Sequence, residues 1–142
     1  MTKQSEFPCQ IYVEDTDYTG VVYHANYLKY LERARTTLFN ELGLSLRQQE
    51  QQGFLYVIRD ITIQYLKPAR LENKLLVKTA LNAIGKTRLH FHQVIDNLTT
   101  DECQITSADI IVICVNQHIK PQPLPQSLLE KINDWTLIME FY

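Results

Sequence analysis

The stretch EDTDYTGVVYH, residues 14–24, gathers the groups with which this chain could do chemistry. Three carboxylates fall within its first four positions, Gly20 follows three residues after Asp17, and an uncharged run then leads to His24. A carboxylate held beside an apolar opening can act as a general base or as a nucleophile. A solvated acidic loop is the structural alternative, so the neighbouring elements must decide between the two.

His24 precedes a segment with helical spacing, and the first N–H groups of a helix have no intrahelical partner and favour negative charge. If Gly20 lets the preceding loop fold back, the N–H groups around Tyr23 and His24 can hold a carbonyl oxygen that becomes an oxyanion. Asp17 is the carboxylate nearest that turn and would lie across from the carbonyl. On spacing alone, a structural aspartate in a turn is the more frequent use of Asp17. The other two carboxylates are interpreted as solvent-facing or structural.

Hydrophobic spacing predicts a helix of about five turns after this stretch. Its apolar stripe steps by four, three, four and four residues through Tyr27, Leu31, Ala34, Leu38 and Leu42. Gly43 is suited to end the helix. On the other side of the carboxylates, alternation over residues 9–13 predicts a short strand with Ile11 and Val13 on one face.

Four extended segments with a period of two follow, over residues 54–65, 74–83, 87–97 and 105–115. In the first of them, Val57, Ile61, Ile63 and Tyr65 are predicted to share a face. The last is apolar on both faces at residues 110–113, which is typical of an interior strand. Short helices are predicted for residues 45–52 and around residues 128–135.

This order of elements predicts an α+β fold with a mainly antiparallel sheet, in which the long helix buries its stripe against the sheet. A curled sheet wrapped around one central helix satisfies that requirement. Such a sheet has edges with which a second copy can pair, so we expect a homodimer.

Composition points to one ordinary globular domain over residues 1–142: 45% of residues are hydrophobic, 21% are charged and the net charge is −2, which gives no sign of a nucleic-acid partner. Cys9, Cys103 and Cys114 have no C-x-x-C spacing and are expected to be buried, reduced thiols, which suits the cytoplasm. No signal peptide or membrane span is predicted. His90 and His92 have a spacing that can bind metal, but a third ligand is not evident in the sequence, and no metal site is predicted.

The segment DYTGVVYHANY, residues 17–27, resembles the signature of the 4-hydroxybenzoyl-CoA thioesterase family of hotdog-fold proteins. The wider stretch VEDTDYTGVVYHANYLKYLERAR, with YLKPARL at residues 65–71, looks most like the Tol-Pal-associated acyl-CoA thioesterase branch. The resemblance runs from about Phe7 to Pro125. It implies a long helix wrapped by an antiparallel sheet, in dimers or tetramers whose active sites draw on both subunits.

The resemblance also implies roles for particular residues. Asp17 is the catalytic carboxylate, acting on water as general base or directly as nucleophile, and the His24 N–H polarises the thioester carbonyl. The 4-hydroxybenzoyl-CoA hydrolases have a Tyr at the position of His24, which favours an aliphatic acyl group here; the His24 ring either touches the reacting groups or has a positional role. The residues expected to bind substrate are Gly20, Val22, Tyr23, Tyr27, Arg70, Lys86 and Arg88, of which Lys86 and Arg88 are favoured for the phosphates of coenzyme A, with Arg70 next.

The resulting prediction is a cytoplasmic acyl-CoA thioesterase that hydrolyses short to medium aliphatic, or alternatively aromatic, acyl-CoA without a cofactor. Two alternatives stay open. An acyl-carrier-protein thioesterase would use the same chemistry on a protein carrier, and a non-catalytic acyl-binding protein of the same fold would not hydrolyse thioesters at all.

Overall fold

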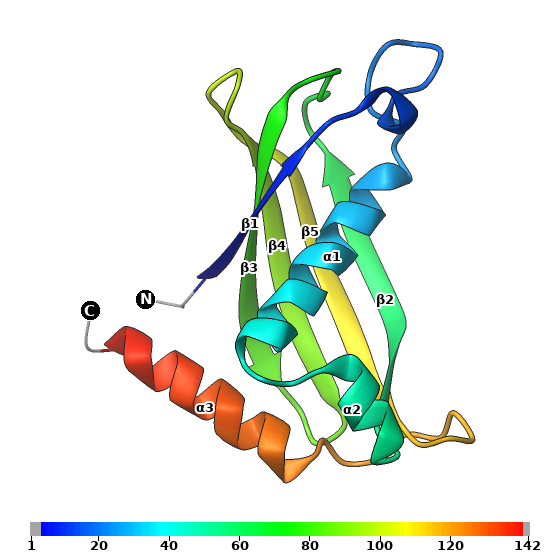
Figure 1. The fold of residues 1–142 in the computed structure, drawn as a ribbon, viewed down its shortest axis with the longest axis vertical. Coiled ribbons are helices and arrows are strands. Elements are labelled where there is room, and N and C mark those ends of the chain that lie inside the picture. Colours follow the sequence, from blue (N-terminus) through cyan, green and yellow to red (C-terminus); the bar gives the residue numbers. More distant parts are fainter. Residues whose placement is uncertain (1–3, 141–142) are drawn as a thin grey trace.

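One long helix, α1 (Asn26–Glu41), lies across a curved antiparallel sheet in the computed structural model, which describes residues 4–140 (Figure 1). The other elements are β1 (Gln4–Gln10), the short 3-10 helix η1 (Val13–Asp15), α2 (Leu46–Gln51), β2 (Leu55–Tyr65), β3 (Lys74–Ile84), β4 (Arg88–Asn97), β5 (Glu102–Val115) and α3 (Gln126–Glu140). The predicted α+β order of elements is confirmed. Within residues 4–140, no helix is both long and apolar enough to cross a membrane.

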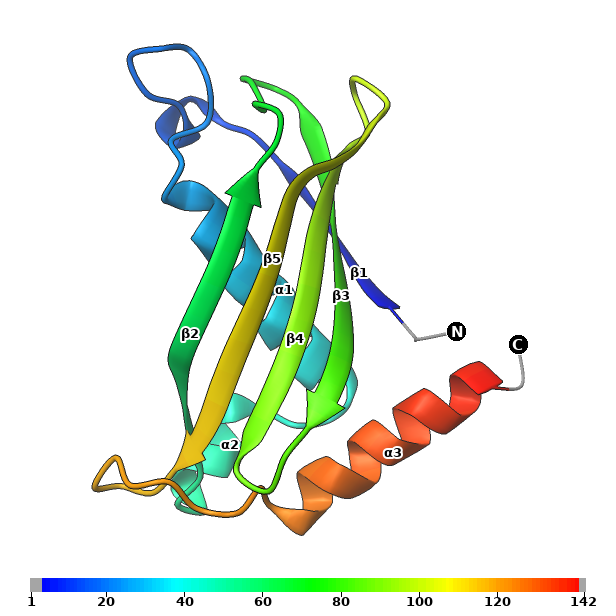
Figure 2. The same cartoon turned by 180° about the vertical axis from the view of Figure 1, so that it is seen from behind.

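The sheet has five strands in the order β1-β3-β4-β5-β2, and every neighbouring pair is antiparallel (Figure 2). β5 is therefore an interior strand, as its two apolar faces predict. β1 and β2 form the two edges. Because α1 approaches β1 and β3 more closely than β2, the inner face of β2 is left partly uncovered.

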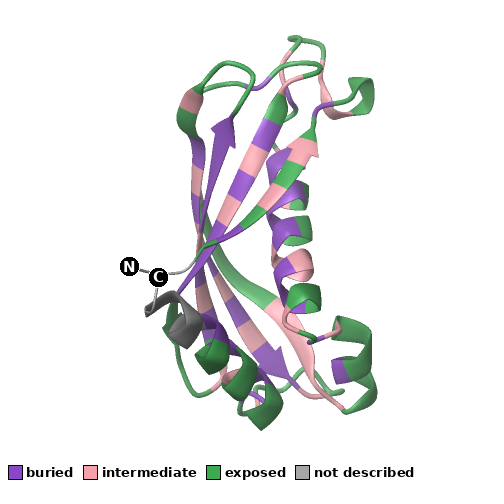
Figure 3. Cartoon of the chain, turned by 60° about the vertical axis from the view of Figure 1, so that its left-hand side comes forward, coloured by how far each residue is buried: buried purple, intermediate pink, exposed green. Residues whose placement is uncertain are grey.

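The α1 helix forms where its apolar stripe was predicted and buries that stripe against the sheet (Figure 3). Tyr27, Leu31, Ala34 and Leu38 are each at most 3% exposed and belong to one hydrophobic core. Gly43 follows the helix with a φ of 74°, a conformation that costs glycine little, so it ends the helix as predicted.

A buried polar chain also fixes α1 to the sheet. The Gln93 side chain on β4 donates to the Leu31 carbonyl at 3.0 Å and to Thr79 Oγ1 on β3 at 2.8 Å, and it accepts from Arg35 Nη1 at 2.9 Å. Burial lowers the pKa of Arg35 to about 10. Since each of these groups would be costly to bury without a partner, the network specifies both the rotation and the height of α1 over the sheet.

The strand predicted over residues 9–13 is wrong in its position, because β1 ends at Gln10. Ile11 is buried, but the chain then turns into η1, where Asp15 Oδ2 accepts a hydrogen bond from the Tyr12 N–H at 2.8 Å. Val13 therefore lies 73% exposed on the turn and does not share a face with Ile11.

A β-bulge changes the inner face of β2. Pairing with β5 shifts between Ile58 and Asp60, so Ile58 joins Ile61 and Tyr65 on the side of α1, and the prediction that Val57 lies on this face is wrong. These three inner side chains are 45%, 38% and 44% exposed, respectively. An apolar groove edge therefore runs along β2 beside α1.

The cysteines depart from the prediction of three buried thiols at two positions, since Cys9 is only partly buried and Cys103 is exposed. Burial raises the pKa of the partly exposed Cys9 to about 11 and also raises the pKa of the buried Cys114, so neither forms the reactive thiolate readily at neutral pH. Cys103 lies near the start of β5.

Candidate active site

A tight turn presents the Asp17 carboxylate. The Asp17 N–H donates to the Val21 carbonyl and the Gly20 N–H donates to the Asp17 carbonyl, both at 3.0 Å. Gly20 has a φ of 82°, which only glycine adopts readily. Asp17 Oδ1 accepts hydrogen bonds from the Thr19 N–H at 2.8 Å and from the Thr19 hydroxyl. Oδ2 has no hydrogen-bond partner within residues 4–140, so Asp17 both shapes the turn and keeps one oxygen free.

The surroundings of Asp17 keep it ionised. Hydrogen bonds from the Thr19 hydroxyl and the Thr19 N–H lower the pKa of Asp17 below its ordinary value, and the charge of His24 acts in the same direction. A carboxylate with a lowered pKa remains an anion across the neutral range, which both proposed roles of a catalytic aspartate require.

We expect Thr19→Val to raise the pKa of Asp17. The substitution keeps the size of the side chain and the backbone bond but removes the hydroxyl donor, which favours the anion, so the carboxylate becomes protonated at a higher pH. A titration of the Asp17 carboxyl carbon by NMR measures the shift. Thr16→Val is the matched control, because the Thr16 hydroxyl donates to the Val13 carbonyl and not to Asp17. If the pKa of Asp17 is unchanged in Thr19→Val, the Thr19 hydroxyl is not the group that lowers it.

The backbone N–H of His24, just before α1, is unpaired and lies a few residues from Asp17. The Tyr23 N–H donates to the Asp15 carbonyl at 2.9 Å, and the Asn26 N–H donates to the Tyr23 carbonyl at 2.9 Å. The His24 N–H lies between these two and has no acceptor in the described part of the chain. The expectation of donors at both Tyr23 and His24 thus narrows to His24, because the Tyr23 N–H is already used.

An apolar cleft of about 280 Å³ opens between the start of α1 and the end of β2. The His24 ring lies 4.6 Å from the Tyr23 ring and 6.1 Å from the Tyr65 ring, measured between centroids. The Tyr27 hydroxyl accepts from the Ala69 N–H at 3.1 Å, which ties α1 to the loop after β2. The lining residues are Val21, Val22, His24, Tyr27, Tyr65, Leu66, Lys67 and Pro68.

Most of the predicted site residues come together here. Val22, Tyr27 and His24 line the cleft, Tyr23 contacts His24, and Gly20 forms the adjoining turn. Arg70 reaches the same region, because its backbone bridges to Val21.

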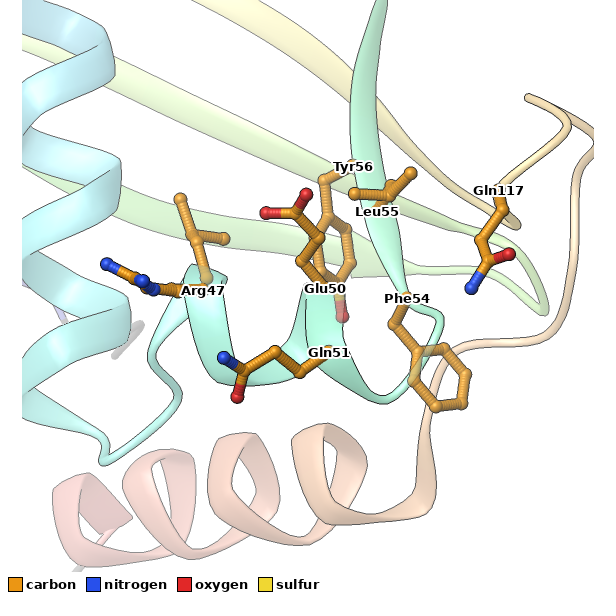
Figure 4. Close-up of a pocket in the computed structure, with 8 residues that line it drawn as sticks. Arg47, Glu50, Gln51, Phe54, Leu55, Tyr56 and Gln117 are labelled. Atoms are coloured by element: carbon orange, nitrogen blue, oxygen red, sulfur yellow. The ribbon is translucent and has the colours of Figure 1, made fainter.

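Lys86 and Arg88 lie at the other end of the sheet within the protomer. Arg88 is opposite Ile113, which pairs with Val57 near the start of β2, whereas the cleft is at the end of that strand (Figure 1). Another cavity, of about 800 Å³, also lies at this far end, beside α2 (Figure 4). Its lining includes Arg47, Glu50 and Gln117 but none of the residues predicted for the site.

The two histidines of β4 face a carboxylate on β5. Asp109 Oδ1 lies 3.3 Å from His90 Nε2 and 3.1 Å from His92 Nδ1, so both rings are hydrogen-bonded to it. Across residues 4–140, no group of three or more His, Cys, Asp or Glu side chains is arranged to hold a metal ion.

The sequence did not indicate two residues that support the site. Asp15 was predicted to be solvent-facing or structural but was given no place in the site, and it is structural: its carbonyl accepts from the Tyr23 N–H, and its carboxylate accepts from the Tyr12 N–H. Asn26 was not singled out, although its side chain donates to the same Asp15 carbonyl. The only available signal was the place of Asn26 at the predicted start of the helix.

Comparison with known proteins shows the family to which this chain belongs. The family model of the thioesterase-like superfamily matches residues 11–132. The acyl-CoA thioester hydrolase YbgC of Escherichia coli O6:H1 is 36% identical over 124 residues, which cover 87% of this chain and 91% of the relative. A structure of a probable thioesterase from Bartonella henselae superposes with a TM-score of 0.79 at 30% identity, over 87% of this chain and 100% of that one.

A third comparison bears on the fold alone. A 1,4-dihydroxy-2-naphthoyl-CoA thioesterase from Synechocystis has a TM-score of 0.85 at 24% identity and covers 93% of this chain and 97% of its own. The predicted hotdog architecture is confirmed. The chain belongs to the thioesterase-like superfamily, and the assignment as a thioester hydrolase is confirmed.

Proposed function

We propose that this protein hydrolyses acyl-CoA to a free acid and coenzyme A, using Asp17 and the His24 N–H. The observation that carries the proposal is the presence, in one short stretch, of an ionised Asp17 carboxylate with one free oxygen and of the unpaired N–H of His24, a residue that lines an apolar cleft. The acyl-CoA activity named for the relative from Escherichia coli supports the choice of substrate class.

In the proposed reaction, the thioester carbonyl oxygen accepts a hydrogen bond from the His24 N–H, which stabilises the negative charge that develops on it. Asp17 either takes a proton from the attacking water or attacks the carbonyl carbon itself, and in the second case water then hydrolyses the acyl-aspartate. In both routes the C–S bond breaks and the sulfur leaves as coenzyme A. The chain's own groups suffice for this proposal, which uses no metal or redox cofactor.

The lining of the cleft supports an aliphatic acyl group. Val21, Val22 and Leu66 contribute aliphatic walls, and Tyr65 closes one side next to His24. Short to medium acyl chains fit the apolar groove edge that continues along β2 better than a group that needs polar contacts. An aromatic acyl group is the alternative within the same class.

A thiol-release assay over acyl-CoA substrates of graded chain length, with benzoyl and 4-hydroxybenzoyl thioesters included, tests the proposal. We expect turnover to be highest with an aliphatic chain. Faster turnover of the same acyl group on an acyl carrier protein would favour a carrier-protein thioesterase. Absence of hydrolysis across the whole panel, on coenzyme A and on carrier protein, would overturn the proposed function in favour of a non-catalytic acyl-binding protein.

We further propose that the protein acts in the cytoplasm as a homodimer or homotetramer. Support comes from edge strand β2, whose Ile58, Ile61 and Tyr65 face inward yet are at least 38% exposed. A second copy paired along β2 would extend the sheet and close the outer side of the apolar groove that these side chains line. Sedimentation at micromolar concentration is expected to show no dominant monomer, and a stable, fully active monomer would refute a shared site.

We expect Arg70→Ala to raise KM for acyl-CoA roughly 10-fold with little change in kcat, since a charge-assisted phosphate contact contributes about 1.5–3 kcal/mol and less when exposed. Arg70 is the predicted phosphate-binding residue that lies beside the cleft in the same protomer. Initial-rate kinetics on the best substrate give both constants. Lys131→Ala, at an exposed position of α3, is the control.

The double variant Lys86→Ala with Arg88→Ala distinguishes a phosphate site within one protomer from a phosphate site that a second protomer completes. Because both residues lie far from the cleft of their own protomer, a raised KM in the double variant would require that another protomer's hairpin completes the phosphate site. An unchanged KM in this double variant, together with a raised KM in Arg70→Ala, would place phosphate recognition at Arg70. An unchanged KM in Arg70→Ala would exclude that residue.

A further inference from the structure

Asn26, the first residue of α1, makes a side-chain contact that the proposed chemistry does not use directly. Its Nδ2 donates to the Asp15 carbonyl oxygen at 2.9 Å, and the residue is 8% exposed. A buried side-chain amide whose N–H group is committed to a backbone carbonyl 11 residues away joins two separate segments. Here the joined segments are the turn that carries Asp17 and the start of α1.

The Asp15 carbonyl accepts a second hydrogen bond from the Tyr23 N–H at 2.9 Å. A carbonyl oxygen has two lone pairs, so these two donors satisfy it. The arrangement decides which N–H group remains available: Tyr23 is engaged, and His24, the next residue, is not. The same carbonyl belongs to the residue two positions before Asp17, so it fixes the donor and the carboxylate relative to one another.

A second observation places Asp15 in a fixed position. Its Oδ2 accepts from the Tyr12 N–H at 2.8 Å, and its carboxylate lies beside the buried hydroxyl of Tyr30 on α1. Burial, and then the neighbouring Asp15 carboxylate, raise the pKa of Tyr30 far above its usual range, so the phenol stays neutral. Asp15 is therefore held on one side by η1 and on the other by α1.

We propose that Asn26 is a positioning residue for catalysis, which locks the Asp15–Asp17 segment onto the first turn of α1 and so aims the His24 N–H and the Asp17 carboxylate at one reacting carbonyl. The inference rests on the proposed function. Asn26 touches neither the substrate nor the reacting atoms, and it acts through the Asp15 carbonyl. Misplacement of catalytic groups by about 1 Å can cost on the order of 10² in rate.

The test compares Asn26→Ala with Asn26→Asp. We expect Asn26→Ala to lose on the order of 10² in kcat at every pH, with KM nearly unchanged. In Asn26→Asp the introduced carboxyl group can donate to the Asp15 carbonyl only when it is protonated. Its pKa is expected to be raised by burial and by that hydrogen bond, so kcat should recover on acidification and fall as pH rises through this pKa. The wild type should show no such fall, because its Asn26 donates at any pH.

Asn82→Asp, at an exposed position in the bulge of β3, is the control for an added charge and should follow the wild-type profile. Melting temperatures identify variants that are merely unfolded. A kcat within several-fold of wild type in Asn26→Ala, or an Asn26→Asp profile parallel to the wild type, would overturn the positioning role.

Amide hydrogen exchange separates this inference from the proposed function. If the tie through Asp15 exists, Asn26→Ala should speed exchange of the Tyr23 N–H while amides of β4 exchange as in wild type. This result does not depend on any substrate. If the wild-type protein hydrolyses no thioester, the proposed function is wrong. If the Tyr23 N–H of Asn26→Ala exchanges at the wild-type rate, the positioning role of Asn26 is wrong.

Discussion

Asp17→Asn is expected to lower kcat on the best acyl-CoA by about 10²–10⁴ if Asp17 is a general base, and by more if it is the nucleophile. The amide keeps the size of the side chain and can still accept hydrogen bonds from Thr19, so the turn should form. What disappears is the anion, and with it the proton acceptor or attacking group. The melting temperature should therefore stay close to that of wild type.

Glu14→Gln is the appropriate control for Asp17→Asn. Glu14 is exposed in the same acidic stretch, and removing its charge tests whether net charge near the cleft matters. Asp15→Asn would be a poor control, because Asp15 is built into the structure through Tyr12 and Tyr30. A folded Asp17→Asn protein that turns over within several-fold of wild type would refute the assigned mechanism.

The second large effect is expected at the backbone of residue 24. His24→Pro removes the N–H and the imidazole together, whereas His24→Ala removes only the imidazole. Loss of one oxyanion donor typically costs about 10²–10³ in kcat, so we expect the proline variant to be slower than the alanine variant by roughly that factor. Proline is tolerated near the first turn of a helix, which makes a folded variant attainable.

Kinetics of the two variants, with circular dichroism and melting temperatures, measure the contribution of the amide. Equal kcat values in His24→Pro and His24→Ala would show that the ring, not the N–H, carries the effect of this position. A drop confined to the proline variant would show that the N–H carries the effect of this position and that the ring, with its contacts to Tyr23 and Tyr65, is dispensable for kcat.

The parts of the fold that depend on local patterns were predictable from sequence. The α1 stripe from Tyr27 to Leu38 and the end of the helix at Gly43 follow from spacing over a few turns, and the structure confirms both. The bulge in β2 was not predictable in this way. It depends on pairing with β5, and one extra residue moves Ile58 to the inner face and Val57 to the outer one.

The site likewise has parts that follow from a local pattern and parts that depend on contacts between distant segments. The turn from Asp17 to Gly20 and its nearness to the helix start could be predicted, because they lie within one short stretch. The availability of His24 rather than Tyr23 could not, since it depends on a hydrogen bond from Tyr23 to Asp15. Likewise, the position of Arg70 beside Val21, and of Lys86 away from the cleft, follows from strand order, which no short motif encodes.

The buried chain of hydrogen bonds from Arg35 through Gln93 to Thr79 has a consequence for how such an enzyme can diversify. It anchors α1 to β3 and β4, and the side chains of Ile58 and Ile61 on β2 take no part in these hydrogen bonds, although Arg35 lines an apolar cavity together with Ile58. Residues such as Ile58 and Ile61 can therefore be exchanged without turning the helix that carries His24 into place. Selection on substrate preference can act on the inner side chains of β2 while these hydrogen bonds keep α1 in its orientation, so related proteins can acquire new acyl specificities without rebuilding the catalytic end.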